Sequence, residues 1–221
     1  MNNEVVAIGD IHGCVDSLKA LWDKLEPWKD RPHIFVGDYI DRGPDSKGVI
    51  DFLLEVKDER KTIFLRGNHE VMLIDSLESG NKTLWLRNGG KTTLESYGDP
   101  ESISELPEDH LEFYRSTKLY HETDDYFFVH AGIPPHLTIE QSKVDEIAQD
   151  YFFWGREHLN AFETPWEKTV VFGHTPRSHP IRKTKMIGID TGCVYDSFGF
   201  GKLTAVVLPE TEFIQQSSLD I

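Results

Sequence analysis

The stretch KTIFLRGNHE at positions 61–70 changes character abruptly at its middle. Residues 62–65 have the β-branched and aromatic content of a buried strand. Residues 66–70 are polar, carry a glycine and a histidine, and cannot join an apolar core. Residues 71–77 then predict a helix. We therefore expect a strand, a loop and a helix, with the loop at the carboxyl end of the strand, where α/β sheets usually bind ligands.

The same order of an apolar run and a polar, glycine-containing loop recurs along the chain. Upstream, residues 5–8 lead into GDIHG (9–13), and residues 33–36 lead into GDYIDRG (37–43). Downstream, strands are predicted at 118–122 and 126–129 as a hairpin, at 169–172, at 186–189, and at 202–208 as the last strand. Three of these lead into HAG (130–132), GHTP (173–176) and DTG (190–192). The pattern predicts an α/β fold with its chemistry at strand ends.

Helices are predicted between these strands. Asp16 is expected to cap a helix that ends at Pro27, and a turn at 44–46 is expected to cap a second helix that reaches residue 56. A helical insertion is expected at about 79–117, broken at residues 88–90, and a further helix or pair of turns at 143–154. Trp85 in this insertion is either local core or a wall for the substrate.

The composition limits the classes of partner. The 221 residues contain 23 Lys and Arg and 38 Asp and Glu, so the formal net charge is −15. Such a surface repels nucleic acid, and two bound divalent cations would offset about four of these charges. No linker composition divides the chain, so we expect one domain over residues 1–221.

The cysteines and the apolar runs bear on the cellular compartment. Cys14 and Cys193 are too few for a disulfide framework and fit a reducing compartment. Each is either a small buried filler or a redox-sensitive thiol near the site. The first strand follows four residues without a basic or apolar leader, and no apolar run approaches about 18 residues, so we expect a cytoplasmic protein without membrane contact.

Several side chains at the strand ends are suited to metal binding. Residues i and i+2 of an extended segment point the same way, so Asp10 and His12 can bind one ion together. A mixed set of carboxylate, amide and imidazole donors suits two adjacent cations, which can deprotonate a shared water and yield a hydroxide nucleophile. The candidate ligands are Asp10, His12, Asp38, Asn68, His130 and His174.

The motifs GDIHG, GDYIDRG, RGNHE, HAG and GHTP, in this order, resemble those of the phosphoprotein phosphatase (PPP) family of metallophosphoesterases. The resemblance spans about residues 9–192, and LWLRNGG (84–90) is similar to the small bacterial and phage serine/threonine phosphatases. It implies two mixed β-sheets packed as a sandwich and flanked by helices, the calcineurin-like metallophosphoesterase fold. It also implies two divalent ions, with Mn²⁺ expected first and Fe or Zn as alternatives.

The resemblance also implies a role for each motif residue. Asp38 would bridge two ions, one held with Asp10 and His12 and the other with Asn68, His130 and His174. His69 would be the general acid and Asp41 would orient its ring. Arg42 and Arg156 would hold the phosphoryl oxygens, since planar guanidinium groups suit phosphate. Arg66 would join them or form a salt bridge that supports Glu70.

These motifs point to a protein phosphatase that acts on phosphoserine and phosphothreonine, with phosphotyrosine also open. One alternative is a symmetrical dinucleoside-tetraphosphate hydrolase, whose family typically has alanine at the position of Asp41. Another is a catalytically silent scaffold, which the complete ligand set disfavours. The larger eukaryotic relatives differ at Ala131 and carry a tyrosine-bearing loop that residues 190–196 do not reproduce. The physiological substrate and the oligomeric state stay open.

Overall fold

The computed structural model describes residues 3–221, and these residues form two five-stranded sheets. The first sheet has the order β10-β9-β1-β2-β3. Strands β1, β2 and β3 are parallel, so they end at one edge of the sheet, while β9 and β10 run antiparallel. Their bounds are β1 Val5–Ile8, β2 His33–Phe35, β3 Thr62–Phe64, β9 Lys202–Leu208 and β10 Glu212–Ser217.

The second sheet has the order β4-β5-β6-β8-β7. Its three central strands are parallel, and the two edge strands are antiparallel to their neighbours. The bounds are β4 Tyr120–Glu122, β5 Tyr126–Val129, β6 Thr169–Phe172, β7 Ile181–Lys183 and β8 Met186–Gly188. Each sheet therefore presents three parallel strand ends, and the polar motifs follow those ends.

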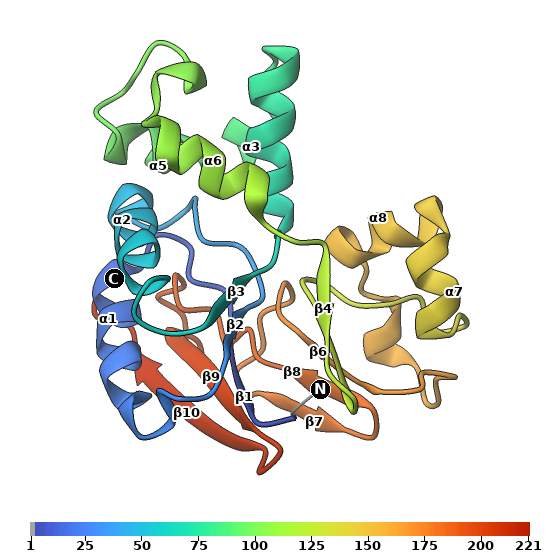
Figure 1. Ribbon diagram of the computed structural model, residues 1–221. Coiled ribbons are helices and arrows are strands. Elements are labelled where there is room, and N and C mark those ends of the chain that lie inside the picture. Colours follow the sequence, from blue (N-terminus) through green and yellow to red (C-terminus); the bar gives the residue numbers. More distant parts are fainter. Residues whose placement is uncertain (1–2) are drawn as a thin grey trace.

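The two sheets pack face to face. Alternate residues of the central strands, such as Ala7 and Ile34 in the first sheet and Phe128 and Val171 in the second, form one buried cluster between them. The outer faces are covered by helices: α1 and α2 lie on the first sheet, and α7 and α8 on the second (Figure 1). This is the expected sandwich of two mixed sheets flanked by helices.

The helices match most of the predicted segments. The expected break at residues 88–90 is confirmed, because Gly89 has a φ of 107° between two short helices. The helix expected over 143–154 is divided at Asp145, whose carboxylate accepts the N–H groups of Ile147 and Ala148. The bounds are α1 Val15–Lys24, α2 Ser46–Val56, α3 Asn68–Ser79, α4 Thr83–Trp85, a π-helical turn Leu86–Gly90, α5 Lys91–Ser96, α6 Glu108–Ser116, α7 Ile139–Val144 and α8 Glu146–Trp154, with 3₁₀ turns at Glu26–Trp28, Ile103–Glu105 and Glu157–Asn160.

Two predictions of local structure are wrong. Asp16 lies inside α1, and the first N–H groups of that helix are instead accepted by Asp220, close to the end of the chain. The strand at 202–208 is not the last one, because β10 follows it. Both β7 and β10 were missed, since these edge strands are largely polar and lack an apolar pattern.

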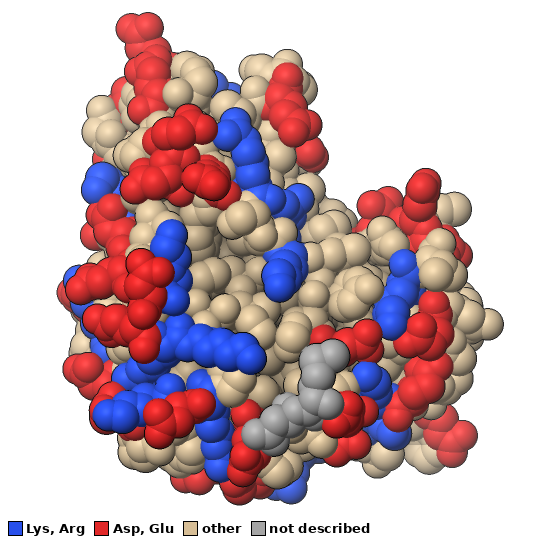
Figure 2. Space-filling view, in the orientation of Figure 1, with Lys and Arg blue, Asp and Glu red and all other residues tan. Residues whose placement is uncertain are grey.

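The surface reflects the acidic composition. On the face drawn in Figure 2, acidic side chains gather over the helices at the outer edges, whereas the surface between them is mostly uncharged. Within residues 3–221, no helix has both the length and the apolar character that crossing a membrane requires.

Candidate active site

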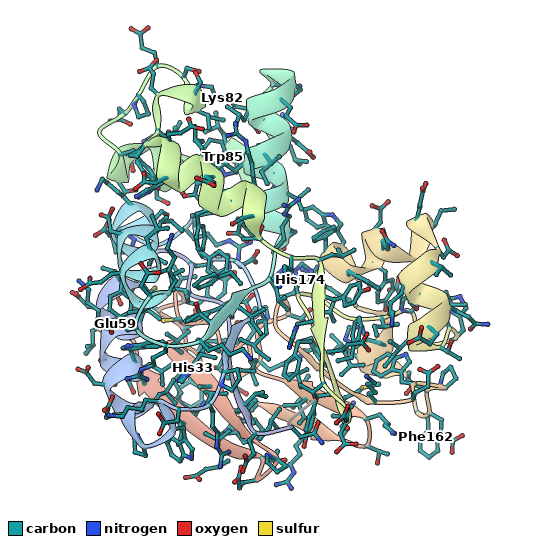
Figure 3. All side chains as sticks on the ribbon, in the orientation of Figure 1. His33, Glu59, Lys82, Trp85, Phe162 and His174 are labelled. Atoms are coloured by element: carbon teal, nitrogen blue, oxygen red, sulfur yellow. The ribbon has the colours of Figure 1, made fainter. Side chains whose placement is uncertain are left out.

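The six predicted metal ligands lie together at the parallel strand ends of both sheets. Asp10 and His12 follow β1, Asp38 follows β2, and Asn68 begins α3 just after β3. The second sheet contributes His130 after β5 and His174 after β6. All six side chains are buried. Figure 3 shows His174 at the place where the two sheets meet the helices above them. The sandwich thus converts six distant sequence positions into one cluster.

The loops that carry these residues are bent in an unusual way. His12, Asp38, Asp41, Arg42 and His174 all have positive φ angles, between 49° and 72°. Non-glycine residues seldom adopt this region, and each such position costs about 1–3 kcal/mol. The surrounding hydrogen bonds hold the bend; for example, the N–H of His12 donates to the carbonyl of Asp38 at 2.9 Å. Strain concentrated in this way is typical of functional sites.

One group of donors is centred on the side-chain oxygen of Asn68. This oxygen lies 2.9 Å from Nε2 of His130 and 2.9 Å from Nδ1 of His174. The same His130 nitrogen is 3.4 Å from a carboxylate oxygen of Asp38. Nδ1 of His130 contacts the carbonyl of Val36 at 3.0 Å, which orients the ring with Nε2 toward the group. Asp38, His130 and His174 are thus arranged to hold a metal ion.

A second group lies on the other side of Asp38. His12, Asp38 and His69 each present a ligand atom, all within 4.8 Å of one another. Nε2 of His12 is 3.5 Å from Asp38, and Nδ1 of His12 contacts the carbonyl of Ile40 at 2.8 Å. Asp38 belongs to both groups, which is the position expected of a bridging carboxylate.

Asp10 is placed against the same cluster. One of its carboxylate oxygens accepts the N–H of His174 at 2.9 Å. Its other oxygen, together with Nε2 of His174 and Nε2 of His69, is buried without a hydrogen-bond partner among residues 3–221. Buried polar atoms are normally paired, so these atoms have free capacity for a ligand. A donor set of carboxylate, amide and imidazole fits borderline divalent cations.

The electrostatics of the cluster also favour cations. Burial raises the pKa of Asp10 well above its usual value, and the nearby Asp190 carboxyl raises it further. Burial opposes ionisation of Asp38 as well, but the surrounding histidines, His130 and His69 foremost, together outweigh it and lower the pKa of that carboxyl. Burial lowers the pKa of His174 to about 2, so its ring stays neutral and keeps a lone pair. Bound cations would reduce the electrostatic repulsion between these buried carboxylates.

His69 and Asp41 form a buried pair beside the cluster. Nδ1 of His69 is 2.6 Å from a carboxylate oxygen of Asp41, and Nε2 is 3.9 Å from Asp38. Burial alone would lower the pKa of His69, but Asp38 and the hydrogen bond to Asp41 outweigh it, so the pKa is raised. Burial also raises the pKa of Asp41. Both pKa shifts favour the protonated form of the pair.

Trp85 and Thr93 hold Asp41 in place, which the sequence did not reveal. The indole N–H of Trp85 donates to both oxygens of Asp41 at 2.9 and 3.0 Å, and the Thr93 hydroxyl donates at 2.6 Å. Trp85 is fully buried, so it is local core and not a substrate wall. The only available signal was the resemblance of LWLRNGG to bacterial phosphatases.

Glu70 connects two of the loops and was also not singled out. Its buried carboxylate accepts the N–H groups of Asp38, Tyr39 and Gly67, each at 2.9 Å. Burial, followed by the charge of Asp38, raises its pKa to about 7. The contacts fix the loop after β2 against the first turn of α3, so Asp38 and Asn68 keep their relative positions.

The three arginines differ in their positions. Arg42 donates from one guanidinium nitrogen to Nε2 of His12 at 2.8 Å and to the Tyr195 hydroxyl at 3.0 Å. Arg156 is exposed, and its charge contributes to lowering the pKa of His174. Arg66 instead donates to Thr117 Oγ1 at 2.9 Å and to carbonyls at the end of α6.

Two expectations are corrected by these contacts. The Arg66 guanidinium binds the carbonyls at the end of α6. It therefore makes neither the expected phosphate contact nor the expected salt bridge to Glu70, whose carboxylate accepts backbone N–H groups instead. The loop at 190–196 does bring a tyrosine to the site, since Tyr195 reaches Arg42. This loop also supplies Asp190, a buried acid whose pKa is raised to about 7 by burial.

The two cysteines behave as packing residues. Both are free and buried. A hydrogen bond with Cys193, followed by burial, raises the pKa of the Cys14 thiol. A buried thiol that resists ionisation is a poor nucleophile, which supports the filler interpretation.

Comparison with known proteins identifies the family of this chain. The model of the calcineurin-like phosphoesterases matches residues 4–198, and the chain belongs to this family. It is 32% identical to an asymmetrical bis(5'-nucleosyl)-tetraphosphatase PrpE from Oceanobacillus iheyensis, over 96% of this chain and 91% of the relative. It is 34% identical to serine/threonine-protein phosphatase 1 from Salmonella typhimurium, over 86% of this chain and 87% of the relative.

A solved structure supports the fold. The chain resembles a protein serine/threonine phosphatase from Saccharomyces cerevisiae with a TM-score of 0.66, at 16% identity, over 99% of this chain and 81% of that one. The sequence relatives and the fold agree with membership of the PPP-like metallophosphoesterases. The chain is therefore a phosphoesterase of this family with donors suited to divalent metals.

Proposed function

We propose that this chain is a metal-dependent phosphomonoesterase that hydrolyses phosphoserine and phosphothreonine in proteins. The observation that carries the proposal is the buried His69–Asp41 pair, in which Asp41 binds one ring nitrogen at 2.6 Å. The other ring nitrogen lies beside Asp38 with no hydrogen-bond partner among the described residues. It can donate a proton to a leaving group. A serine or threonine alkoxide is strongly basic and needs such a donor.

The cluster around Asp38 would hold the cofactor, a pair of Mn²⁺ or similar ions. Asp10, His12 and Asp38 would hold one ion, and Asp38, Asn68, His130 and His174 the other. When bound, such ions stabilise phosphoryl charge and lower the pKa of water. Asp38 belongs to both groups of donors, and the neighbouring imidazoles favour its negatively charged form. The strained loops and their hydrogen bonds fix the positions of these donors.

Arg42 and Arg156 would bind the phosphoryl oxygens. Both lie close to candidate ligands, Arg42 beside His12 and Arg156 within electrostatic reach of His174. A guanidinium can make two parallel hydrogen bonds to phosphate, so it orients the group as well as attracting it. The Tyr195 hydroxyl accepts from Arg42 and restrains its position.

A second candidate is asymmetrical hydrolysis of a dinucleoside tetraphosphate, because the PrpE relatives carry that name. The name of these relatives specifies asymmetrical cleavage, whereas the alternative considered from the motifs was symmetrical cleavage. This reaction expels a nucleotide, which leaves through a phosphate oxygen. That oxygen is a much weaker base than an alkoxide and has less need of a general acid. The His69–Asp41 pair therefore favours the monoesterase.

A substrate panel tests the choice. The purified chain with Mn²⁺ should hydrolyse a phosphoserine peptide with a kcat/KM at least about 10-fold above that for diadenosine tetraphosphate, because only the first substrate uses the acid fully. A chelator should abolish both reactions. Faster hydrolysis of the dinucleotide, with ATP and AMP as products, would favour the second candidate instead.

A further inference from the structure

The carboxyl end of α8 is fixed next to the site. The N–H of Ala131, in the loop after β5, donates to the carbonyl of Phe152 at 2.7 Å, and the Phe152 side chain is fully buried. The N–H of Gly155 donates to the carbonyl of Tyr151 at 2.8 Å, and the Tyr151 ring occupies the space that a Cβ on residue 155 would need. Trp154, the last residue of α8, is thus held by a rigid helix end.

The Trp154 ring lies beside a candidate metal ligand. Its plane is perpendicular to the His174 imidazole, at 90°, with the ring centroids 6.3 Å apart. Arg156, a proposed phosphate contact, is two residues further along the chain. A phosphoryl group held by the cluster and by Arg156 would therefore lie near this indole.

The exposure of Trp154 is not explained by packing. The face of α8 that packs on the sheet carries Ala148 and Phe152. Trp154 is 44% exposed, whereas Trp22, Trp85 and Trp166 are at most 5% exposed and Trp28 is half-buried. A tryptophan that served only the core would bury its ring, because burying an aromatic side chain is strongly favourable. Part of the Trp154 side chain is therefore accessible to a ligand.

We propose that Trp154 is a specificity-determining residue that stacks against a planar aromatic group carried on the substrate phosphate. The inference rests on the proposed function, because the same site cleaves the ester. Both a phosphotyrosine side chain and the base of a nucleotide offer such a group, and serine and threonine offer none. Stacking on an aromatic side chain tolerates any planar ring, so Trp154 widens the range of substrates beyond alkyl phosphates.

The test compares two peptides of one sequence that differ only in phosphotyrosine or phosphoserine. Trp154→Leu should lower the ratio of kcat/KM for phosphotyrosine to kcat/KM for phosphoserine about 10-fold, and Trp154→Phe should restore most of it. Inhibition by AMP, relative to inhibition by inorganic phosphate, should weaken by a similar factor if a base uses the same surface. Phe162→Leu is the control, since Phe162 is 98% exposed and lies far from His174 in Figure 3.

The outcomes separate the two proposals. A fall in either ratio supports stacking and identifies its source, an aryl side chain or a base. Unchanged ratios in both arms, or an equal loss on every substrate together with loss of metal, would overturn this role of Trp154. A wild-type chain that leaves phosphoserine untouched would contradict the proposed function, whatever the Trp154 variants do.

Discussion

His69 has two ring nitrogens with different surroundings. Nδ1 lies 2.6 Å from a carboxylate oxygen of Asp41. Nε2 lies 3.9 Å from Asp38 and has no hydrogen-bond partner among residues 3–221. The contact to Asp41 fixes the ring and favours a proton on the imidazole. This division of roles is what a proton donor to a leaving group requires.

His69→Asn should therefore slow turnover according to the leaving group. General acid catalysis typically contributes about 10²–10⁴-fold, so phosphoserine peptide turnover should fall by about 100-fold or more. Turnover of p-nitrophenyl phosphate should fall far less, because nitrophenolate leaves without a proton. His179→Asn, at an exposed position, is the control. Equal losses on both substrates, or loss of metal from the His69 variant, would show that His69 serves the metals instead.

At this scale the sequence predicted the residues that belong to motifs. The spacing of Asp10 and His12, and the strand ends before Asp38, His130 and His174, indicated one cluster, and the structure places these side chains together. Arg66 did not follow its motif, because whether a long guanidinium side chain faces the site or a neighbouring helix end depends on tertiary packing. Tyr195 was missed for the same reason.

Among the elements, the segment from α4 to α5 has a supporting role in the site. Trp85 at the end of α4 and Thr93 in α5 both bind Asp41, and the π-helical turn between them places the carbonyl of Gly89 against the N–H of Arg42. The positive φ of Gly89 lets the two helices turn toward the same loop. The helical insertion thus holds Asp41, the partner of the proposed general acid His69, in place.

Trp85→Phe tests this support. The change keeps a buried ring but removes the N–H that donates to Asp41. We expect phosphoserine turnover to fall about 10-fold, since the orientation of His69 is less supported, with a smaller effect on p-nitrophenyl phosphate. Trp22→Phe removes a buried indole elsewhere in the core and should leave both rates unchanged. A Trp85 variant with the kinetics of the wild type would exclude a positioning role.

The elements were predictable where they were apolar. Strands β1, β5 and β6 are buried, and their apolar composition predicts them. Strands β7 and β10 are polar edge strands, which are recognised only from their pairing in the structure. The break of α8 from α7 depends on one capping side chain, Asp145, in a segment whose apolar residues run on across it. Contacts such as Asp220 on α1 join the ends of the chain and leave no local signal.

At the scale of the whole molecule, the site exists because two sheets end at the same place. The first sheet contributes Asp10, His12, Asp38 and Asn68, and the second contributes His130 and His174. The chain as a whole carries a formal charge of −15, and several of its carboxylates are buried near one another at this junction. We expect this junction to hold a pair of cations with Asp38 shared between them.

Metal analysis of the purified chain and of one variant tests for the shared pair of ions. The wild type, loaded with Mn²⁺ and freed of excess ions, should contain close to two ions per chain, and Asp38→Asn should lose most of both, because it removes the shared ligand. Asp75→Asn, at an exposed position on α3, should keep the wild-type content. An Asp38 variant that keeps two ions, or a wild-type chain that is fully active with one, would contradict the account.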